Sequence, residues 1–280
     1  MIESWIVIAF ISGLLSNTSN FLHRFLLKDD KDPALYTWFL EVVRLTVALI
    51  FLLFNFHLVL SMQALWLLLA LGAFEGISIY VYMKQHAFTS LSISTIISRT
   101  RLIWTALFAF IFLGENFSPM TYAGIAVLFI GLSVGTAPHK IKADPGMKYA
   151  YLSAMMISIA NILMKSATAF ASAPVIVAAM AIPTIISFPL ILKNSKKRIK
   201  AFLHENLLHK TLAALANVLA LFFLLWALSL GPVSLVNAIY QGTMIFAILA
   251  GILFLKERED VVKKLIGTAI AVVGVMLLSL

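Results

Sequence analysis

The sequence predicts an all-α polytopic membrane protein with ten transmembrane helices arranged as two inverted five-helix repeats. Three observations predict this fold. Hydrophobic residues make up 62% of the 280 residues and charged residues only 12%, whereas a soluble domain carries about 25% charged residues. The apolar residues gather into segments of about 20, the length of a helix that spans the hydrocarbon of a bilayer. The two halves of the chain also repeat one another.

The ten predicted spans are separated by short connections, such as TSLS (89–92), GENFSP (114–119) and LGPVS (230–234). Because these connections are short, neighbouring helices must run antiparallel. The largest loop, KNSKKRIKAFLHENLLHK (193–210), is basic, and we expect it to lie on anionic membrane lipids rather than to bind nucleic acid. We predict spans over residues 4–22, 34–54, 64–84, 92–113, 119–137, 147–168, 174–192, 210–230, 233–254 and 264–280.

Lysine and arginine in the loops fall on one side of the predicted topology. Sixteen of them follow the first, fifth, seventh and ninth spans, and the opposite side has essentially none. The positive-inside rule makes the basic side cytoplasmic and puts both termini outside an inner or plasma membrane. The sixteen are Arg24, Lys28, Lys31, Lys140, Lys142, Lys148, Lys193, Lys196, Lys197, Arg198, Lys200, Lys210, Lys256, Arg258, Lys263 and Lys264.

The repeat is clearest after two glutamates, Glu115 and Glu257, which lie 142 residues apart. Behind them GIAVLFIG (124–131) corresponds to GTAIAVVG (267–274). Since each copy has an odd number of spans, the second copy enters the membrane inverted, as in many secondary transporters. We expect each glutamate to cap the helix that follows it. The predicted parts are a first repeat (1–137), a connecting loop (138–146) and a second repeat (147–280).

The segments FLGENFSPMTYAGIAVLFIG (112–131) and FLKEREDVVKKLIGTAIAVVG (254–274) resemble the EamA-type family of the drug/metabolite transporter superfamily. The resemblance covers nearly the whole chain and implies a ten-helix bundle that moves amino acids or other small metabolites. Lys256 replaces the glycine that usually precedes the second glutamate. Family members usually keep their termini in the cytoplasm, which the loop charges here contradict. The proline often found midway in the fourth and ninth helices is also missing.

Charged residues inside predicted spans are costly and therefore candidates for function. Glu41 and Arg44 are three residues apart on one helix, close enough to pair, so a self-contained structural ion pair is an equal alternative. Glu75 lies midway along its helix, and the repeat offset matches it with Asn217. At that depth we expect its charge to be relieved by a proton, by a cation such as Arg101, or by a substrate amine.

Arg99 and Arg101 lie in the fourth span, and the repeat offset matches them with Gln241 and Thr243. Because they alternate on a helix, we expect one to face the cavity and the other to be paired or to snorkel. Lys84 and Lys165, nearer to helix ends, are expected to snorkel.

Weaker candidates are uncharged. Asn20 and Asn161 match across the repeats, although hydrogen bonding between helices explains such residues equally well. Tyr82 and Tyr240 can line a cavity or simply pack.

Several functional classes are disfavoured. The chain has no cysteine and no paired histidine motif, so we expect no metal and no cofactor. GLSVG (131–135) spells a hydrolase nucleophile motif but falls in an apolar helix, so we expect no enzyme. Without a P-loop, ATP hydrolysis cannot power transport in this chain. A channel would need an ordered ring or filter, which is missing.

The leading hypothesis is a secondary transporter that works by alternating access. Apart from the lysines at span edges that are counted with the loops, the predicted spans contain five cations and two anions. This excess favours a carboxylate-bearing substrate, most simply an amino-acid-like zwitterion, with proton or exchange coupling possible. A larger organic anion or a nucleotide-type metabolite is the alternative, followed by a membrane-embedded enzyme or lipid-handling subunit.

Overall fold

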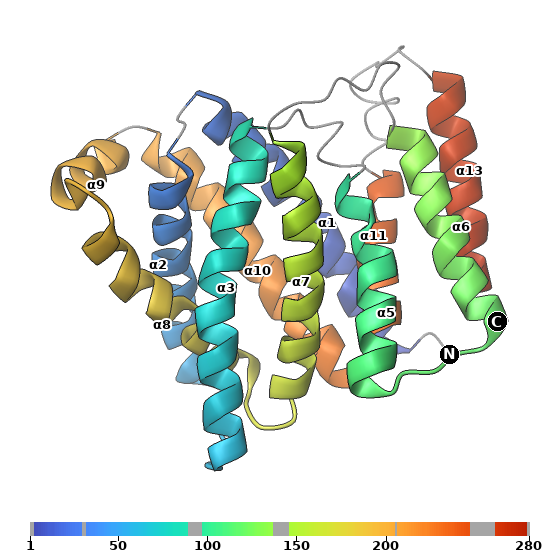
Figure 1. Cartoon of the computed structure of the whole chain (residues 1–280), viewed down its shortest axis with the longest axis horizontal. Coiled ribbons are helices and arrows are strands. Elements are labelled where there is room, and N and C mark those ends of the chain that lie inside the picture. Colours follow the sequence, from blue (N-terminus) through green and yellow to red (C-terminus); the bar gives the residue numbers. More distant parts are fainter. Residues whose placement is uncertain are drawn as a thin grey trace.

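The computed structural model describes residues 3–29, 32–88, 97–136, 146–204, 206–246 and 261–278. These residues form helices that stand side by side in one bundle, and the all-α class is confirmed (Figure 1). The described helices are α1 (Ser4–Asp29), α2 (Pro33–Leu52), α3 (Met62–Phe88), α5 (Arg101–Leu113), α6 (Pro119–Thr136), α7 (Met147–Ala167), α8 (Ala173–Ile191), α9 (Ser195–His204), α10 (Leu207–Leu230), α11 (Val233–Gly242) and α13 (Val261–Leu277).

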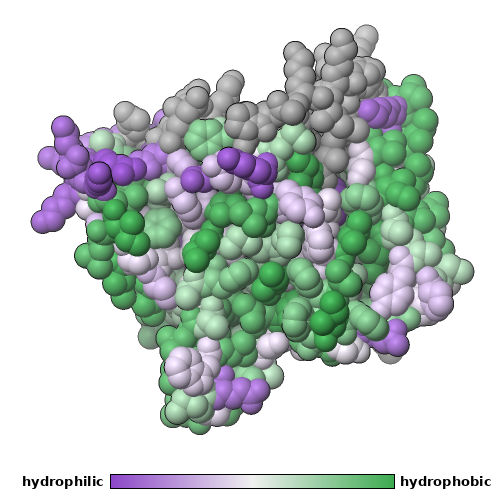
Figure 2. Space-filling model, in the orientation of Figure 1, coloured by the Kyte–Doolittle hydropathy of each residue, from purple (hydrophilic) through white to green (hydrophobic). Residues whose placement is uncertain are grey.

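Within the described residues, six helices are long and apolar enough to cross a membrane, namely α1, α2, α3, α7, α8 and α10. The other four predicted spans coincide with the shorter helices α5, α6, α11 and α13, and parts of these spans lie outside the described residues. Apolar side chains cover the flank of the bundle, while polar residues concentrate at the end that carries α9 (Figure 2). The chain is therefore a multi-pass membrane protein.

Helices of the two halves pack in matched pairs. The α1–α10 contact is mirrored by the α7–α3 contact, since α1 and α7 open the two halves and α3 and α10 are their third long helices. In the same way α2 packs on α8, α5 on α11, and α6 on α13, each against its counterpart. Figure 1 shows α1 and α7 running in opposite directions. Such matched contacts are what a half-turn rotation between two copies produces.

Glycine lets α6 and α13 approach closely. A Cβ atom on Gly131 would lie 2.3 Å from the Ala271 nitrogen, and one on Gly267 would lie 2.2 Å from the Gly135 nitrogen. Neither position can carry a larger side chain without moving a backbone. Gly131 and Gly135 are the glycines of the GLSVG motif, so this motif packs two membrane helices, as such small residues commonly do.

Glu115 caps α11 rather than the helix that follows it, which corrects the sequence expectation. Its Oε1 accepts a hydrogen bond from the Val233 nitrogen at 2.6 Å, and its Oε2 accepts from the Ser234 nitrogen at 3.1 Å and hydroxyl at 2.7 Å. The first turn of a helix has unpaired N–H groups that favour a carboxylate, and α11 has no cap of its own. The following helix, α6, is capped by Ser118. Glu257 lies outside the described residues.

Two cations bind the carbonyl ends of helices at opposite ends of the bundle. Arg24 on α1 donates from Nη1 to the His86 carbonyl of α3 at 2.6 Å. Lys165 on α7 donates from Nζ to the Leu228 carbonyl of α10 at 2.6 Å and to the Gly231 carbonyl at 2.9 Å. Lys165 is therefore anchored and does not snorkel. Each cation joins the α1–α10 pair to the α3–α7 pair, and we call them the two closing contacts.

Candidate functional site

Turns interrupt two helices at equivalent places in the two halves. Residues 97–99 are helical, Thr100 is a turn, and α5 begins at Arg101. In the second half α11 ends at Gly242, Thr243 is a turn, and residues 244–246 are helical again. Since neither turn contains a proline, the breaks do not need the family's proline. Interrupted helices frame the binding sites of many transporters built from inverted repeats.

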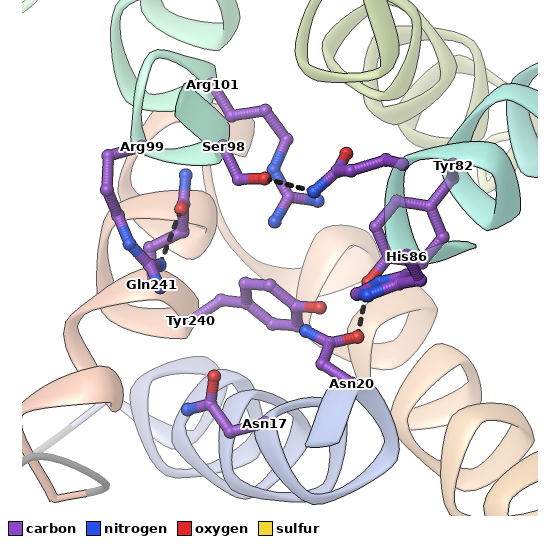
Figure 3. Close-up of a pocket in the computed structure, with 10 residues that line it drawn as sticks. Asn17, Asn20, Tyr82, His86, Ser98, Arg99, Arg101, Tyr240 and Gln241 are labelled. Carbon is purple, nitrogen blue, oxygen red and sulfur yellow. Dashed lines mark hydrogen bonds between the residues drawn. The ribbon is translucent and has the colours of Figure 1, made fainter. Parts of the chain in front are cut away.

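A first cavity, which we call the arginine cavity, lies beside these turns (Figure 3). Its volume of about 30 Å³ leaves room for a few water molecules only. Polar side chains from both halves form its wall. The lining residues are Asn17, Asn20, Tyr82, Gln85, His86, Ser98, Arg99, Arg101, Tyr240 and Gln241.

Hydrogen bonds between the halves order this wall. Arg99 donates from Nη1 to Oε1 of Gln241 at 2.9 Å. Asn17 on α1 donates to the Thr243 hydroxyl at 2.9 Å, and within the first half Tyr82 on α3 donates to Asn20 on α1. These contacts fix the positions of the polar side chains around the small volume of the arginine cavity.

Arg101 differs from Arg99 because its guanidinium group donates no hydrogen bond to any described residue. It is only 7% exposed, and its Nε has no partner among these residues. Its guanidinium carbon lies 5.9 Å from the centre of the Tyr240 ring. Figure 3 shows the side chain reaching into the cavity. Both arginines line the cavity, which differs from the expectation that one turns away from it, whereas the pairing expected for the other arginine is present in the Arg99–Gln241 hydrogen bond. The turn at Thr100 breaks the helical alternation on which that expectation depended.

A second cavity, which we call the carboxylate cavity, adjoins the first and has a volume of about 70 Å³. Tyr82, Arg101 and Tyr240 line both cavities. The space lies between the α1–α10 pair and the α3–α7 pair. Its polar lining residues are Ser16, Arg44, Glu75, Tyr82, Arg101, Asn161, Asn217, Asn237 and Tyr240.

Arg44 connects three polar residues at one wall of the carboxylate cavity. Its Nη1 donates to Oε1 of Glu41 at 2.7 Å and to Oε1 of Glu75 at 3.1 Å, and its Nη2 donates to Oδ1 of Asn217 at 2.8 Å. The predicted Glu41–Arg44 contact is therefore present. Glu75, however, is bonded to Arg44 and not to Arg101. Both carboxylates are buried, at 0% and 5% exposure, so one guanidinium serves two acids away from bulk water.

Ten of the eleven candidate residues line one cavity or the other. Glu41 lines neither cavity and is hydrogen-bonded to Arg44. Sequence reasoning missed Ser16, Asn17, Gln85, His86, Ser98 and Asn237. The repeat offset could have found one of them, because Ser98 lies 142 residues before Tyr240. In the described residues no group of three or more His, Cys, Asp or Glu side chains could hold a metal ion.

Comparisons with known proteins agree with this architecture. A family model described as the EamA-like transporter family matches residues 3–136 and again residues 144–280. A solved structure titled only "Crystal structure of protein" has a TM-score of 0.69 over 100% of this chain and 99% of its own, at 16% sequence identity. At that identity the likeness shows the fold alone. No curated protein matches the chain.

Proposed function

Since the chain belongs to the EamA-like transporter family, within the drug/metabolite transporter superfamily, we propose that it is a secondary transporter of a small carboxylate-bearing metabolite. An amino-acid-like zwitterion fits best. The proposal rests on Arg101, because a buried arginine whose guanidinium has no hydrogen-bond partner among the described residues is costly unless an anion joins it. The fork of a guanidinium matches a carboxylate with two parallel hydrogen bonds.

The position of Arg101 also supports a zwitterion. Arg101 lines both cavities, with Arg99 beside it in the arginine cavity and Glu75 in the carboxylate cavity. A substrate carboxylate held by Arg101 would extend its amino group toward Glu75 and the amide oxygens of Asn161 and Asn217. Both cavities are small, so we infer that the substrate enters after the helices around them separate.

The arrangement of the halves supports alternating access as the transport mechanism. The cavities lie where the interrupted helices meet, and the closing contacts at Arg24 and Lys165 lie at opposite ends of the space between the helix pairs. Opening one end while the other stays closed would expose the cavities to one side of the membrane at a time. The loop charges favour a cytoplasmic position for the end that carries α9, with both termini outside.

Transport by purified protein in liposomes tests the proposed function. A panel of radiolabelled solutes should contain amino acids, the amines that lack their carboxylate, and larger organic anions. We expect saturable uptake of a carboxylate-bearing solute, its loss in Arg101→Gln, and its retention in the control Arg198→Gln. Arg198 is a suitable control because it pairs with Asp32 at the surface, where its side chain is 36% exposed. Uptake of the amines alone, or full uptake by Arg101→Gln, would overturn the proposal.

A further inference from the structure

The cluster of Glu41, Arg44 and Glu75 contains two acids and one base. We propose that it is a proton-binding site that holds one proton when no substrate is bound and exchanges it for the amino group of the substrate. The second half of this inference rests on the proposed function, and the first half does not.

Charge balance supplies the first argument. With both acids ionised, the cluster would carry one net negative charge at a depth where Glu41 is 0%, Arg44 3% and Glu75 5% exposed. Its third partner, Asn217, is neutral and accepts from Arg44 through its amide oxygen, so it adds no positive charge. A buried carboxylate without a full partner is strongly disfavoured. One bound proton makes the cluster neutral.

The hydrogen bonds supply the second argument. Oε1 of both glutamates accepts from the same nitrogen of Arg44, whereas Oε2 of Glu41 is buried and has no partner among the residues that the structure describes. An ionised carboxylate needs donors at both oxygens. Because Oε2 of Glu41 has no donor among the described residues, burial disfavours the charged form of Glu41 relative to the neutral carboxyl group. Two buried acids that share one guanidinium disfavour the state in which both are charged, so one of them binds a proton.

Other charged or titratable groups nearby do not replace that proton. On α1, His23 is bound to Ser19 and Tyr36. On α3, Tyr82 donates to Asn20, and His86 makes no hydrogen bond to a described residue at either ring nitrogen, so it does not contact the acids.

The groups on the remaining neighbouring elements are likewise engaged elsewhere. On α7, Lys165 is held by carbonyls at the end of α10, and on α10, Lys210 donates to the Phe202 carbonyl. Tyr240 on α11 bonds to Ser16. Arg101 lines the same cavity but makes no hydrogen bond to either acid. Among the described groups, Arg44 is the only cation that contacts the two carboxylates.

Access to the cavity determines which acid exchanges its proton. Glu75 lines the carboxylate cavity and Glu41 does not, so a ligand can reach Glu75. Asn161 lines the same cavity and is 3% exposed, and its Oδ1 has no partner in the described part of the chain. A carboxylate and an unpaired amide oxygen are the acceptors that an ammonium group requires. An ammonium bound there neutralises the cluster in place of the proton, so binding should release the proton.

Infrared spectroscopy of the purified protein tests the proton site without any substrate. A protonated buried carboxyl group has a C=O stretch separate from that of a carboxylate. At neutral pH we expect this band in the unmodified protein, its loss in both Glu41→Gln and Glu75→Gln, and its retention in the control Asp32→Asn. Each glutamine variant leaves one acid for one guanidinium, so no proton is needed. A missing band in the unmodified protein, or a band that survives in both variants, would overturn the proton site.

Proton release on binding tests the exchange. The probes are a mixture of L-amino acids and a mixture of the matching 2-oxo acids, added to purified protein in weakly buffered solution with a pH indicator. We expect about one proton released per amino acid bound, none with the 2-oxo acids, and none from Glu75→Gln. Amino acid binding without release overturns the exchange. If neither mixture binds, the proposed amino-acid-like substrate and the exchange both fail, whereas the infrared result on the proton site stands.

Discussion

Arg99 donates a hydrogen bond to Gln241 at 2.9 Å, and the two residues occupy equivalent positions 142 residues apart in the two halves. Glu75 and Asn217 are separated by the same offset, and both accept hydrogen bonds from Arg44. Counterparts can meet only close to the axis that relates the two copies. The direct Arg99–Gln241 contact and the Glu75–Asn217 pair joined through Arg44 therefore mark the centre of the bundle. Inverted-repeat transporters hold their substrates at this place.

Replacing Gln241 by glutamate should strengthen the contact with Arg99. A charge-assisted hydrogen bond is roughly twice as strong as one between neutral groups, and it would hold the two halves closed. We expect Gln241→Glu to raise the thermal midpoint of the purified protein and to lower its maximal transport rate. The control Gln241→Met, which removes the bond, should lower the midpoint. An unchanged transport rate in Gln241→Glu would mean that the contact does not limit opening.

Replacing Arg101 by lysine should weaken substrate binding while keeping the charge. Lysine cannot offer the two parallel donors of a guanidinium group. We expect Arg101→Lys to raise the KM for the carboxylate substrate about tenfold, equivalent to about 1.4 kcal/mol. The control Arg198→Lys, at the surface, should leave KM unchanged. Equal KM values for both variants would show that the carboxylate binds elsewhere.

The effects of substitutions at Glu41, Arg44 and Glu75 on stability should depend on one another. Removing the guanidinium in Arg44→Ala leaves two buried acids unpaired and should destabilise the protein by about 3–5 kcal/mol, the cost of breaking one buried pair. The double variant Glu41→Gln, Arg44→Met should recover only part of this loss, since Glu75 still lacks its partner. Adding Glu75→Gln should recover the rest. The thermal midpoints of the single, double and triple variants measure these changes in stability. If the double and triple variants regain the same stability, the Arg44–Glu75 contact is contradicted.

Periodicity and the repeat offset predicted much of this architecture. The offset identified Gln241 and Asn217 as counterparts of Arg99 and Glu75. The structure brings these counterparts together because symmetry-related residues near the axis become neighbours. It did not identify the partner of Glu115, which lies on α11 of the other half and is reached only through packing. Spacing along one helix predicted the Glu41–Arg44 contact, but no local pattern could show that Arg44 also reaches Glu75 on α3.

Orientation in the membrane can be measured with single cysteines, because the chain has none of its own. Lys196 is exposed on α9, and Asn116 is exposed in the connection at the opposite end. We expect an impermeant maleimide to label Asn116→Cys in intact cells and to label Lys196→Cys only after permeabilisation, because the basic end should be cytoplasmic. The reverse pattern would restore the family's usual orientation.

The last prediction concerns the two closing contacts. Arg24 closes the end of the cavities that lies toward α9, and Lys165 closes the end that lies toward the termini. A hydrogen bond to a charged group contributes about 1.5–3 kcal/mol. Losing one contact should therefore shift the balance between the two open states by about tenfold or more, in opposite directions for the two residues.

A cysteine at Ala220, which is 4% exposed and lines the carboxylate cavity, reports this balance. With a maleimide applied to the face that carries the termini, we expect labelling of Ala220→Cys to become faster with Lys165→Leu and slower with Arg24→Leu. Lys200→Leu, at an exposed lysine on α9, is the matched control and should change nothing. If both variants shift the labelling rate in the same direction, or neither shifts it, these contacts are helix caps without a part in gating. Opposite shifts can arise only if each contact holds one end of the same cavity closed.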